Sequence, residues 1–116
     1  MNPTELKART KAFALRIIKL TQALPNTAAG RAIASQIVRS GTAVAANYRA
    51  TCRARSKAEF IAKIGVVEEE ADETALWLEL LAESDLVPAR RLGKLLDEAN
   101  ELTAIMAASR KTAGDK

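Results

Sequence analysis

The longest regular pattern of apolar positions in the chain runs from Ser56 to about Ser84. Apolar or small residues recur there at alternating steps of three and four, as expected for a helix packed lengthwise against near-parallel neighbours. The row consists of Phe60, Ile64, Val67, Ala71, Thr74, Leu78 and Leu81. Ser56 and Glu59 form a capping-box pattern at its start, in which each side chain bonds the backbone N–H of the other residue. The pattern predicts a helix over residues 56–84 that needs partners along its whole length.

Three further periodic segments predict these partners, as helices over about residues 3–23, 28–53 and 88–110. Their core rows are, in chain order, Leu6, Phe13, Ile17, Leu20 and Leu24; Ile33, Ile37, Gly41, Val44 and Tyr48; and Leu92, Leu95, Ala99, Leu102 and Met106. Short connections favour antiparallel neighbours. We therefore expect one all-α domain, residues 1–116, folded as an up-and-down antiparallel four-helix bundle.

A glycine, Gly41, stands inside the second predicted helix, where it costs roughly 1 kcal/mol relative to alanine. The small residues Ala45 and Ala46 follow it, so this is the thinnest part of that helix. We expect the backbone of a neighbouring helix to approach closely here.

The composition restricts the chemistry. Hydrophobic residues make up 48% of the chain and aromatic residues only 3%, which favours helix–helix packing over sheets. With no histidine and one cysteine, the chain lacks the ligands of zinc and di-iron sites and the base for a nucleophile. We interpret Cys52 as a mostly buried small residue, and we expect no catalytic residue, metal, cofactor or enzymatic activity. No apolar run has the length of a signal peptide or membrane span, so we expect a cytoplasmic protein without a membrane partner.

Charge is unevenly distributed along the chain, although the net charge is only +4. Residues 1–57 carry eleven lysines and arginines and one acid, whereas residues 58–87 carry nine acids and one lysine. Either the basic helices neutralise the acidic one internally, or part of the basic surface is left for a polyanion. The candidate nucleic-acid-binding residues are Arg31, Arg39, Arg49, Arg53, Arg55 and Lys57. Three of them, Arg31, Arg49 and Arg53, share the side of their helix opposite its core row.

A set of polar residues lies beside the core rows of the second and third predicted helices: Gln36, Ser40, Asn47, Glu70 and Glu73. If these helices are antiparallel neighbours, Arg39 can pair with Glu70 or Glu73. A buried pair of this kind mainly fixes register. We interpret the set as a structural polar motif, with a ligand or nucleic-acid role as the alternative.

Apolar residues outside the core rows indicate a candidate oligomer interface formed by Trp77, Leu80 and Val38, together with Leu15 or Ile18. This is more apolar surface than one slim bundle buries, and exposed apolar surplus marks contact sites between proteins. The alternative is that Trp77 covers one end of the core within a single chain.

Two stretches resemble a known family. Residues 35–50 read SQIVRSGTAVAANYRA, and the third helix contains SKAEFI, EEADET and WLELL at residues 56–61, 69–74 and 77–81. These motifs are similar to those of the bacterial four-helix-bundle proteins named for the intervening sequence of 23S ribosomal RNA. Arg39, Ser40, Asn47, Glu70 and Glu73 match the polar motif positions of that family, whereas Ala50 stands where an acid is common.

The resemblance implies a cytoplasmic bacterial homopentamer with no established enzymatic activity. Some members resemble the accessory protein of diversity-generating retroelements, a basic pentamer that engages nucleic acid and a reverse transcriptase. Our first hypothesis is an oligomeric accessory protein that binds the backbone of RNA or DNA. The alternative is a scaffold that recruits a protein partner through an apolar or acidic helix face.

Overall fold

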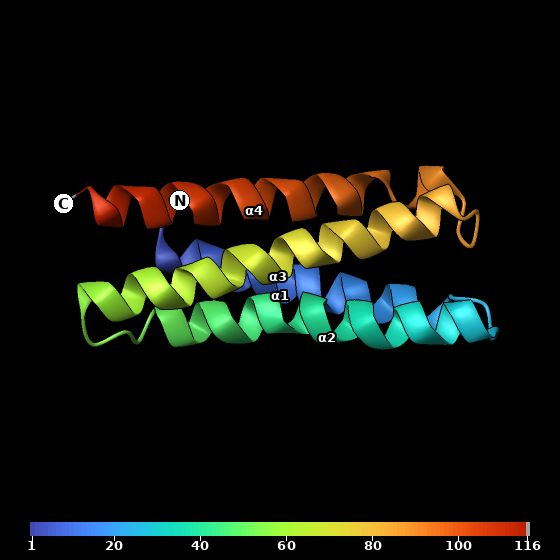
Figure 1. The fold of residues 1–116 in the computed structure, drawn as a ribbon, viewed down its shortest axis with the longest axis horizontal. Helices are drawn as coiled ribbons and strands as arrows, with labels where there is room; N and C mark the ends of the chain where they lie inside the picture. Colours follow the sequence, from blue (N-terminus) through green and yellow to red (C-terminus); the bar gives the residue numbers. More distant parts are fainter. Residues whose placement is uncertain (116) are drawn as a thin grey trace.

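Four long helices joined by short connections make up the structure, a computed structural model that describes residues 1–115 (Figure 1). The elements are α1 (Pro3–Gln22), α2 (Ala28–Thr51), α3 (Lys57–Glu83), the short 3₁₀ helix η1 (Ala89–Arg91) and α4 (Gly93–Gly114). Residues 1–115 contain no strand. The expected all-α four-helix bundle is thus confirmed. None of the helices in this part of the chain is both long and apolar enough to cross a membrane.

The helices form an elongated bundle of 47 × 20 × 19 Å in which each helix packs along the next. Contacts are extensive between α1 and α2, α2 and α3, and α3 and α4, but sparse between α1 and α4. The start of α1, the α2–α3 connection and the end of α4 lie at one end (Figure 1). The α1–α2 connection and η1 lie at the other. The bundle therefore has one loosely packed seam, between α1 and α4.

Side-chain caps start the first three helices, including the one predicted at Ser56. The side chains of Asn2, Thr27 and Ser56 each accept a hydrogen bond from the backbone N–H three residues later. Such caps satisfy N–H groups that have no partner within the helix. The capping box at Ser56 is only half formed, because the Glu59 carboxylate accepts from the N–H of Arg55 at 3.2 Å.

The fourth helix starts later than the sequence predicts. Instead of beginning at Pro88, α4 begins at Gly93, after the 3₁₀ helix η1. The N–H groups of Arg91 and Leu92 bond the carbonyls three residues earlier, at 2.9 and 3.0 Å. This tighter winding places the Leu92 side chain in the core, where it is 0% exposed. Burial of Leu92 thus accounts for the irregular start.

Most residues of the predicted core rows are buried, including all five of the last row. The exceptions are half-buried residues near the ends of the bundle, where fewer helices cover them: Leu20, Leu24, Ile33 and Phe60. The core also contains residues outside the predicted rows, namely Thr10, Ala14, Thr51, Ala75 and Val87. Thr10 can be buried at little cost because its hydroxyl donates to the Leu6 carbonyl at 2.8 Å.

Gly41 faces a close neighbour, but this neighbour is a side chain and not the expected backbone. A Cβ at position 41 would lie 2.8 Å from Cγ2 and 2.9 Å from Cγ1 of Ile17 on α1. Gly65 on α3 differs, because its nearest neighbour would be Arg110 Cδ at an ordinary 3.7 Å. The chain therefore offers two helical glycines in contrasting surroundings.

The α1/α4 seam is bridged by a charged cluster. The Arg9 guanidinium donates from Nε to Glu98 Oε2 at 2.7 Å and from Nη2 to Oε1 at 2.6 Å. The same Nη2 lies 3.0 Å from Glu101. The hydrogen bond with Glu98 raises the pKa of Arg9 above its ordinary value. The fork-to-carboxylate geometry makes this the strong type of ion pair.

We expect Gly41→Ala to lower the free energy of unfolding by about 1–3 kcal/mol, because overpacking against Ile17 outweighs the gain in helix propensity. Gly65→Ala is the matched control. It should raise the free energy of unfolding by about 0.5–1 kcal/mol, since only the propensity term acts there. Urea denaturation of the three proteins measures both changes. Equal effects of the two substitutions would show that Ile17 does not constrain position 41.

Arg9→Ala should lower the free energy of unfolding by about 1–3 kcal/mol, because it leaves the half-buried Glu98 carboxylate without its partner. Arg9→Lys keeps the positive charge but loses the bidentate hydrogen bonding to Glu98, so it should lower the free energy of unfolding by less than Arg9→Ala. Thermal unfolding of the three proteins makes the comparison. An Arg9→Ala protein as stable as the parent would mean that the seam does not depend on this bridge.

Candidate functional site

The expected pairing of Arg39 with acids of α3 is present in the structure. Arg39 Nη1 lies 3.3 Å from Glu70 Oε2, and Nη2 bonds Glu73 Oε2. The hydrogen bond with Glu73 raises the pKa of Arg39. Glu73 also accepts from Trp77 Nε1 at 3.2 Å. Arg39 therefore joins α2 to α3 at the surface. It differs from the other candidate nucleic-acid-binding residues because its guanidinium is paired with carboxylates of the same chain.

Beneath this surface pair lies a buried hydroxyl contact between the same helices. Thr74 donates to Ser40 Oγ at 2.8 Å, and Ser40 donates to the Ile37 carbonyl at 3.3 Å. Both side chains are 0% exposed. Buried polar groups need such partners, and the pair fixes the register of α2 against α3. The sequence analysis placed Thr74 in the apolar row and missed its polar contact. The hydroxyl of Thr74 within that row was the one sign of a polar partner on α2.

The rest of the predicted polar motif is dispersed. Gln36 is exposed and Asn47 is half-buried. Neither side chain makes a hydrogen bond within residues 1–115. The backbone carbonyl of Asn47 accepts from the Thr51 hydroxyl at 2.8 Å. The structure thus divides the motif into an α2–α3 contact and two separate polar side chains.

The candidate interface residues lie partly open on α2 and α3. Leu80 is 40% exposed, whereas Val38 and Trp77 are half-buried. Leu76, which sequence reasoning missed, adds an exposed side chain one turn from Leu80. On α1, Leu15 is the most open large aliphatic side chain at 58% exposure. The apolar surplus expected from the sequence is therefore present on the surface of the single chain.

The basic candidates on α2 are exposed but do not form one patch. Arg31 precedes Arg49 by eighteen residues, which at 1.5 Å per residue separates them by about 27 Å along the helix. Arg31 donates to the Asn26 side chain at 3.0 Å. Arg53, Arg55 and Lys57 lie around the α2–α3 connection, at the other end of the bundle. The structure thus places most of the candidates at this end and leaves Arg31 apart.

Near Arg49 the structure brings in two cations that sequence reasoning missed. Lys7 and Lys11 of α1 line a groove with Arg49 of α2, hereafter the α1/α2 groove. Its remaining lining consists of small residues: Ala8, Ala14, Thr42, Ala45 and Ala46. No acidic residue lines it. The periodicity of α1 places both lysines on its outer side but does not show that they face Arg49.

Internal ion pairs account for little of the positive charge. Of the eleven lysines and arginines in residues 1–57, only Arg9 and Arg39 pair with a carboxylate of residues 1–115. The acidic helix α3 meets α2 through Arg39 alone among these pairs. Direct ion pairs within the described part of the chain therefore involve only two of these eleven cations.

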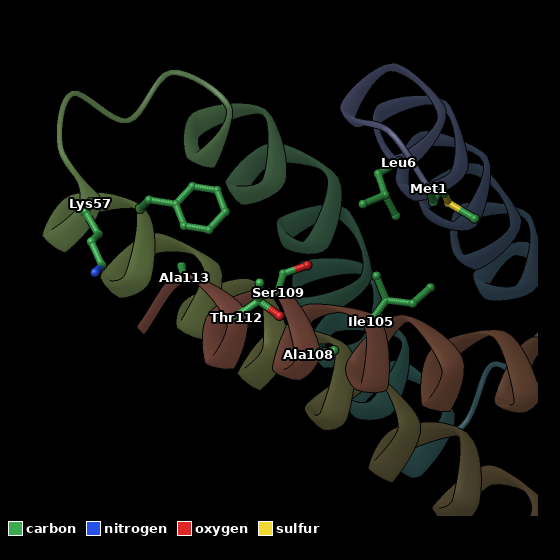
Figure 2. Close-up of a pocket in the computed structure, with 9 residues that line it drawn as sticks. Met1, Leu6, Lys57, Ile105, Ala108, Ser109, Thr112 and Ala113 are labelled. Carbon is green, nitrogen blue, oxygen red and sulfur yellow. The ribbon is translucent and has the colours of Figure 1, made fainter. Parts of the chain in front are cut away.

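An apolar pocket opens at the end of the bundle where α1 starts and α4 ends (Figure 2). Leu6 and Ile105 lie on one side, and Lys57 and Ala113 on the other (Figure 2). The polar side chains of its lining are Lys57, Ser109 and Thr112. No carboxylate lines it, so it holds no acid–base pair.

The remaining reactive side chains are at the same end of the bundle. Cys52 is half-buried at the end of α2, beside the buried Tyr48. Burial raises the pKa of the Tyr48 phenol above its ordinary value, so this group stays protonated at neutral pH. Residues 1–115 contain no group of three cysteine, aspartate or glutamate side chains placed to hold a metal ion.

Comparisons with known proteins agree on one family. No curated protein shows a significant match. The structure is similar to the crystal structure of a protein of unknown function from the S23 ribosomal protein family of Bacteroides thetaiotaomicron, with a TM-score of 0.87 and 32% identity. The similarity covers 96% of this chain and 99% of that one. The model of the family described as 23S rRNA-intervening sequence protein matches residues 4–108. The chain therefore belongs to the 23S rRNA-intervening sequence protein family.

Proposed function

We propose that this protein is a non-enzymatic, cytoplasmic homo-oligomer that binds the phosphate backbone of RNA or DNA as an accessory protein. The observation that carries the proposal is the unpaired positive charge of residues 1–57, where nine of the eleven lysines and arginines have no carboxylate partner in residues 1–115. Each cation that neutralises a phosphate releases counterions, so such side chains contribute additively to binding. By family resemblance, we include in this proposal a relation to the accessory proteins of diversity-generating retroelements.

The aromatic residues support a backbone-directed mode over base recognition. Phe13 and Tyr48 are buried at 1% and 5% exposure, and Phe60 and Trp77 are partly buried against the core. Stacking of bases needs exposed aromatic faces. The binding surface is the α1/α2 groove with the neighbouring Arg53, Arg55 and Lys57. This surface should therefore discriminate only weakly between nucleotide sequences.

Self-association is supported by the distribution of charge and apolar surface. The outer face of α3 carries the exposed acids Glu69, Asp72, Glu79 and Glu83 around Leu76 and Leu80. Leu15 of α1 is a further exposed aliphatic side chain, on a helix that does not contact α3. Two different apolar faces on one chain favour head-to-tail contacts, which form rings where the rotation between subunits closes, and they leave the α1/α2 groove open to the nucleic acid. By family resemblance we propose a pentamer.

The acidic and apolar face of α3 also favours a second candidate function. Leu76 and Leu80, surrounded by acids, form a surface suited to a basic amphipathic helix of another protein. In this case the protein is a scaffold without nucleic acid. Salt sensitivity separates the two functions, since backbone binding weakens steeply with salt and apolar recruitment does not.

Binding of structured RNA and duplex DNA should fall by orders of magnitude between about 50 and 200 mM salt if several phosphates are contacted. The double variant Arg49→Ala/Arg53→Ala should lower the salt slope by about two, because each arginine accounts for about one unit. Arg39→Ala is the control: its guanidinium is engaged by Glu70 and Glu73, so the slope should stay unchanged. Fluorescence anisotropy titrations give these slopes.

Absence of binding by the parent protein at the lower salt concentration would contradict the proposed function. A loss of slope in Arg39→Ala about half of that in the double variant would show that binding follows net charge alone, because Arg39→Ala removes one charge and the double variant removes two. In that case the α1/α2 groove would have no specific role.

Light scattering should show an oligomer, and Leu80→Glu should shift it to the monomer because it places a charge within an apolar contact. Ala104→Glu changes an exposed residue of α4 and should leave the mass unchanged. A monomeric parent protein would contradict self-association. An unchanged oligomer of Leu80→Glu would place the interface on another face.

A further inference from the structure

A second basic hollow lies at the other end of the bundle, between α1 and the start of α4. Its walls carry five cations: Arg16 and Lys19 of α1, Arg90 and Arg91 of η1, and Lys94 of α4. Leu20, Ala23 and Leu95 complete its lining. None of the six basic residues selected from the sequence lies in this hollow, hereafter the α1/α4 basic cleft.

No carboxylate compensates these cations. None of the five forms an ion pair within residues 1–115, and no acidic residue lines the cleft. Glu98 and Glu101 of α4 are bonded to Arg9. Asp97 follows Lys94 by about one turn but is exposed and outside the lining. The cleft is therefore a concentration of unneutralised positive charge.

The start of α4 adds to this positive potential. α4 has neither a side-chain cap nor an acidic residue in its first turn, in contrast to α1 and α3. The N-terminal end of a helix carries a partial positive charge, which favours anions. Here it coincides with the cations of η1 and Lys94.

The cleft also lies where the bundle is least tightly packed. α1 and α4 make sparse contact, and their ion pairs are those of Arg9 in the middle of the seam. At the cleft, cations on α1 face cations on η1 and α4, and like charges repel across a gap of this kind. An anion bound between the two walls would remove this repulsion and bridge the helices.

We propose that the α1/α4 basic cleft is a second binding site for backbone phosphates of a nucleic acid, and that phosphate binding there clamps α1 to α4. The proposal rests on the proposed function and adds a site to it. No aromatic residue lines the cleft, so contacts are to phosphates and not to stacked bases. The cleft and the α1/α2 groove lie toward opposite ends of a 47 Å bundle, so one chain contacts two separate backbone segments.

The test uses the full chain and a fluorescently labelled RNA duplex of about 20 base pairs, titrated at about 50 and 200 mM salt. The cleft variant is Arg90→Ala/Arg91→Ala/Lys94→Ala. The control, Lys63→Ala/Arg110→Ala/Lys111→Ala, removes the same net charge from helix positions remote from the cleft, where Lys63 and Arg110 are already paired with Glu59 and Glu68. We expect the cleft variant to bind about tenfold more weakly at low salt and to lose about two to three units of slope, and the control to change much less.

Thermal unfolding provides a second measurement that also checks folding. Without RNA, the cleft variant should unfold at the same temperature as the parent or higher, because repulsion between the walls is reduced. With RNA, the parent and the control should be stabilised, since a ligand that binds only the folded state raises its stability. The cleft variant should lose most of this stabilisation.

The outcomes separate this proposal from the proposed function. If the parent binds RNA and the cleft variant binds like the control, the cleft is not a site, while backbone binding elsewhere stands. If only Arg49→Ala/Arg53→Ala weakens binding, the α1/α2 groove is the sole site and the cleft proposal is overturned. If the parent does not bind RNA at low salt, both proposals fail.

Discussion

Ser40 and Gly41 are adjacent on α2 but face different helices, and through them α2 fixes the positions of both its neighbours. The Ser40 hydroxyl meets Thr74 of α3, and the bare Cα of Gly41 allows Ile17 of α1 to approach within van der Waals contact. The first contact is polar and directional, so it sets register. The second depends on the absence of a side chain, so it sets the distance between helices. With α1, α2 and α3 placed in this way, α4 packs along α3 and leaves the α1/α4 seam open.

The open seam between α1 and α4 accounts for two hollows on the surface. A fully closed bundle would place the basic side chains of α1 on separate outer faces. In this structure the Arg9–Glu98 ion pair bridges the middle of the seam. An apolar pocket lies at one end of the bundle and the basic cleft at the other. None of the exposed acids on the outer face of α3 lines either hollow. Charge separation within one small domain is therefore a consequence of how the four helices meet.

The periodicity of apolar residues was sufficient to predict the fold, because steps of three and four define which face of each helix is buried. It could not predict the late start of α4, since Pro88 is an acceptable first residue and only burial of Leu92 favours the 3₁₀ turn. The pairing of Arg39 was predictable from antiparallel neighbours alone. The basic cleft was not predictable, because a net charge summed over a segment does not show which cations remain unpaired. Residues 88–116 carry six lysines and arginines and four acids, so their net charge is small. In the structure, however, Glu98 and Glu101 bind Arg9 and leave Arg90, Arg91 and Lys94 uncompensated.

The contact between Gly41 and Ile17 has an evolutionary consequence. The two positions share a single volume, so a substitution at one changes which residues are acceptable at the other. Relatives with alanine or serine at position 41 should carry a smaller residue, such as valine or alanine, at position 17. Across the family these two positions should therefore vary together, although twenty-four residues separate them in the chain.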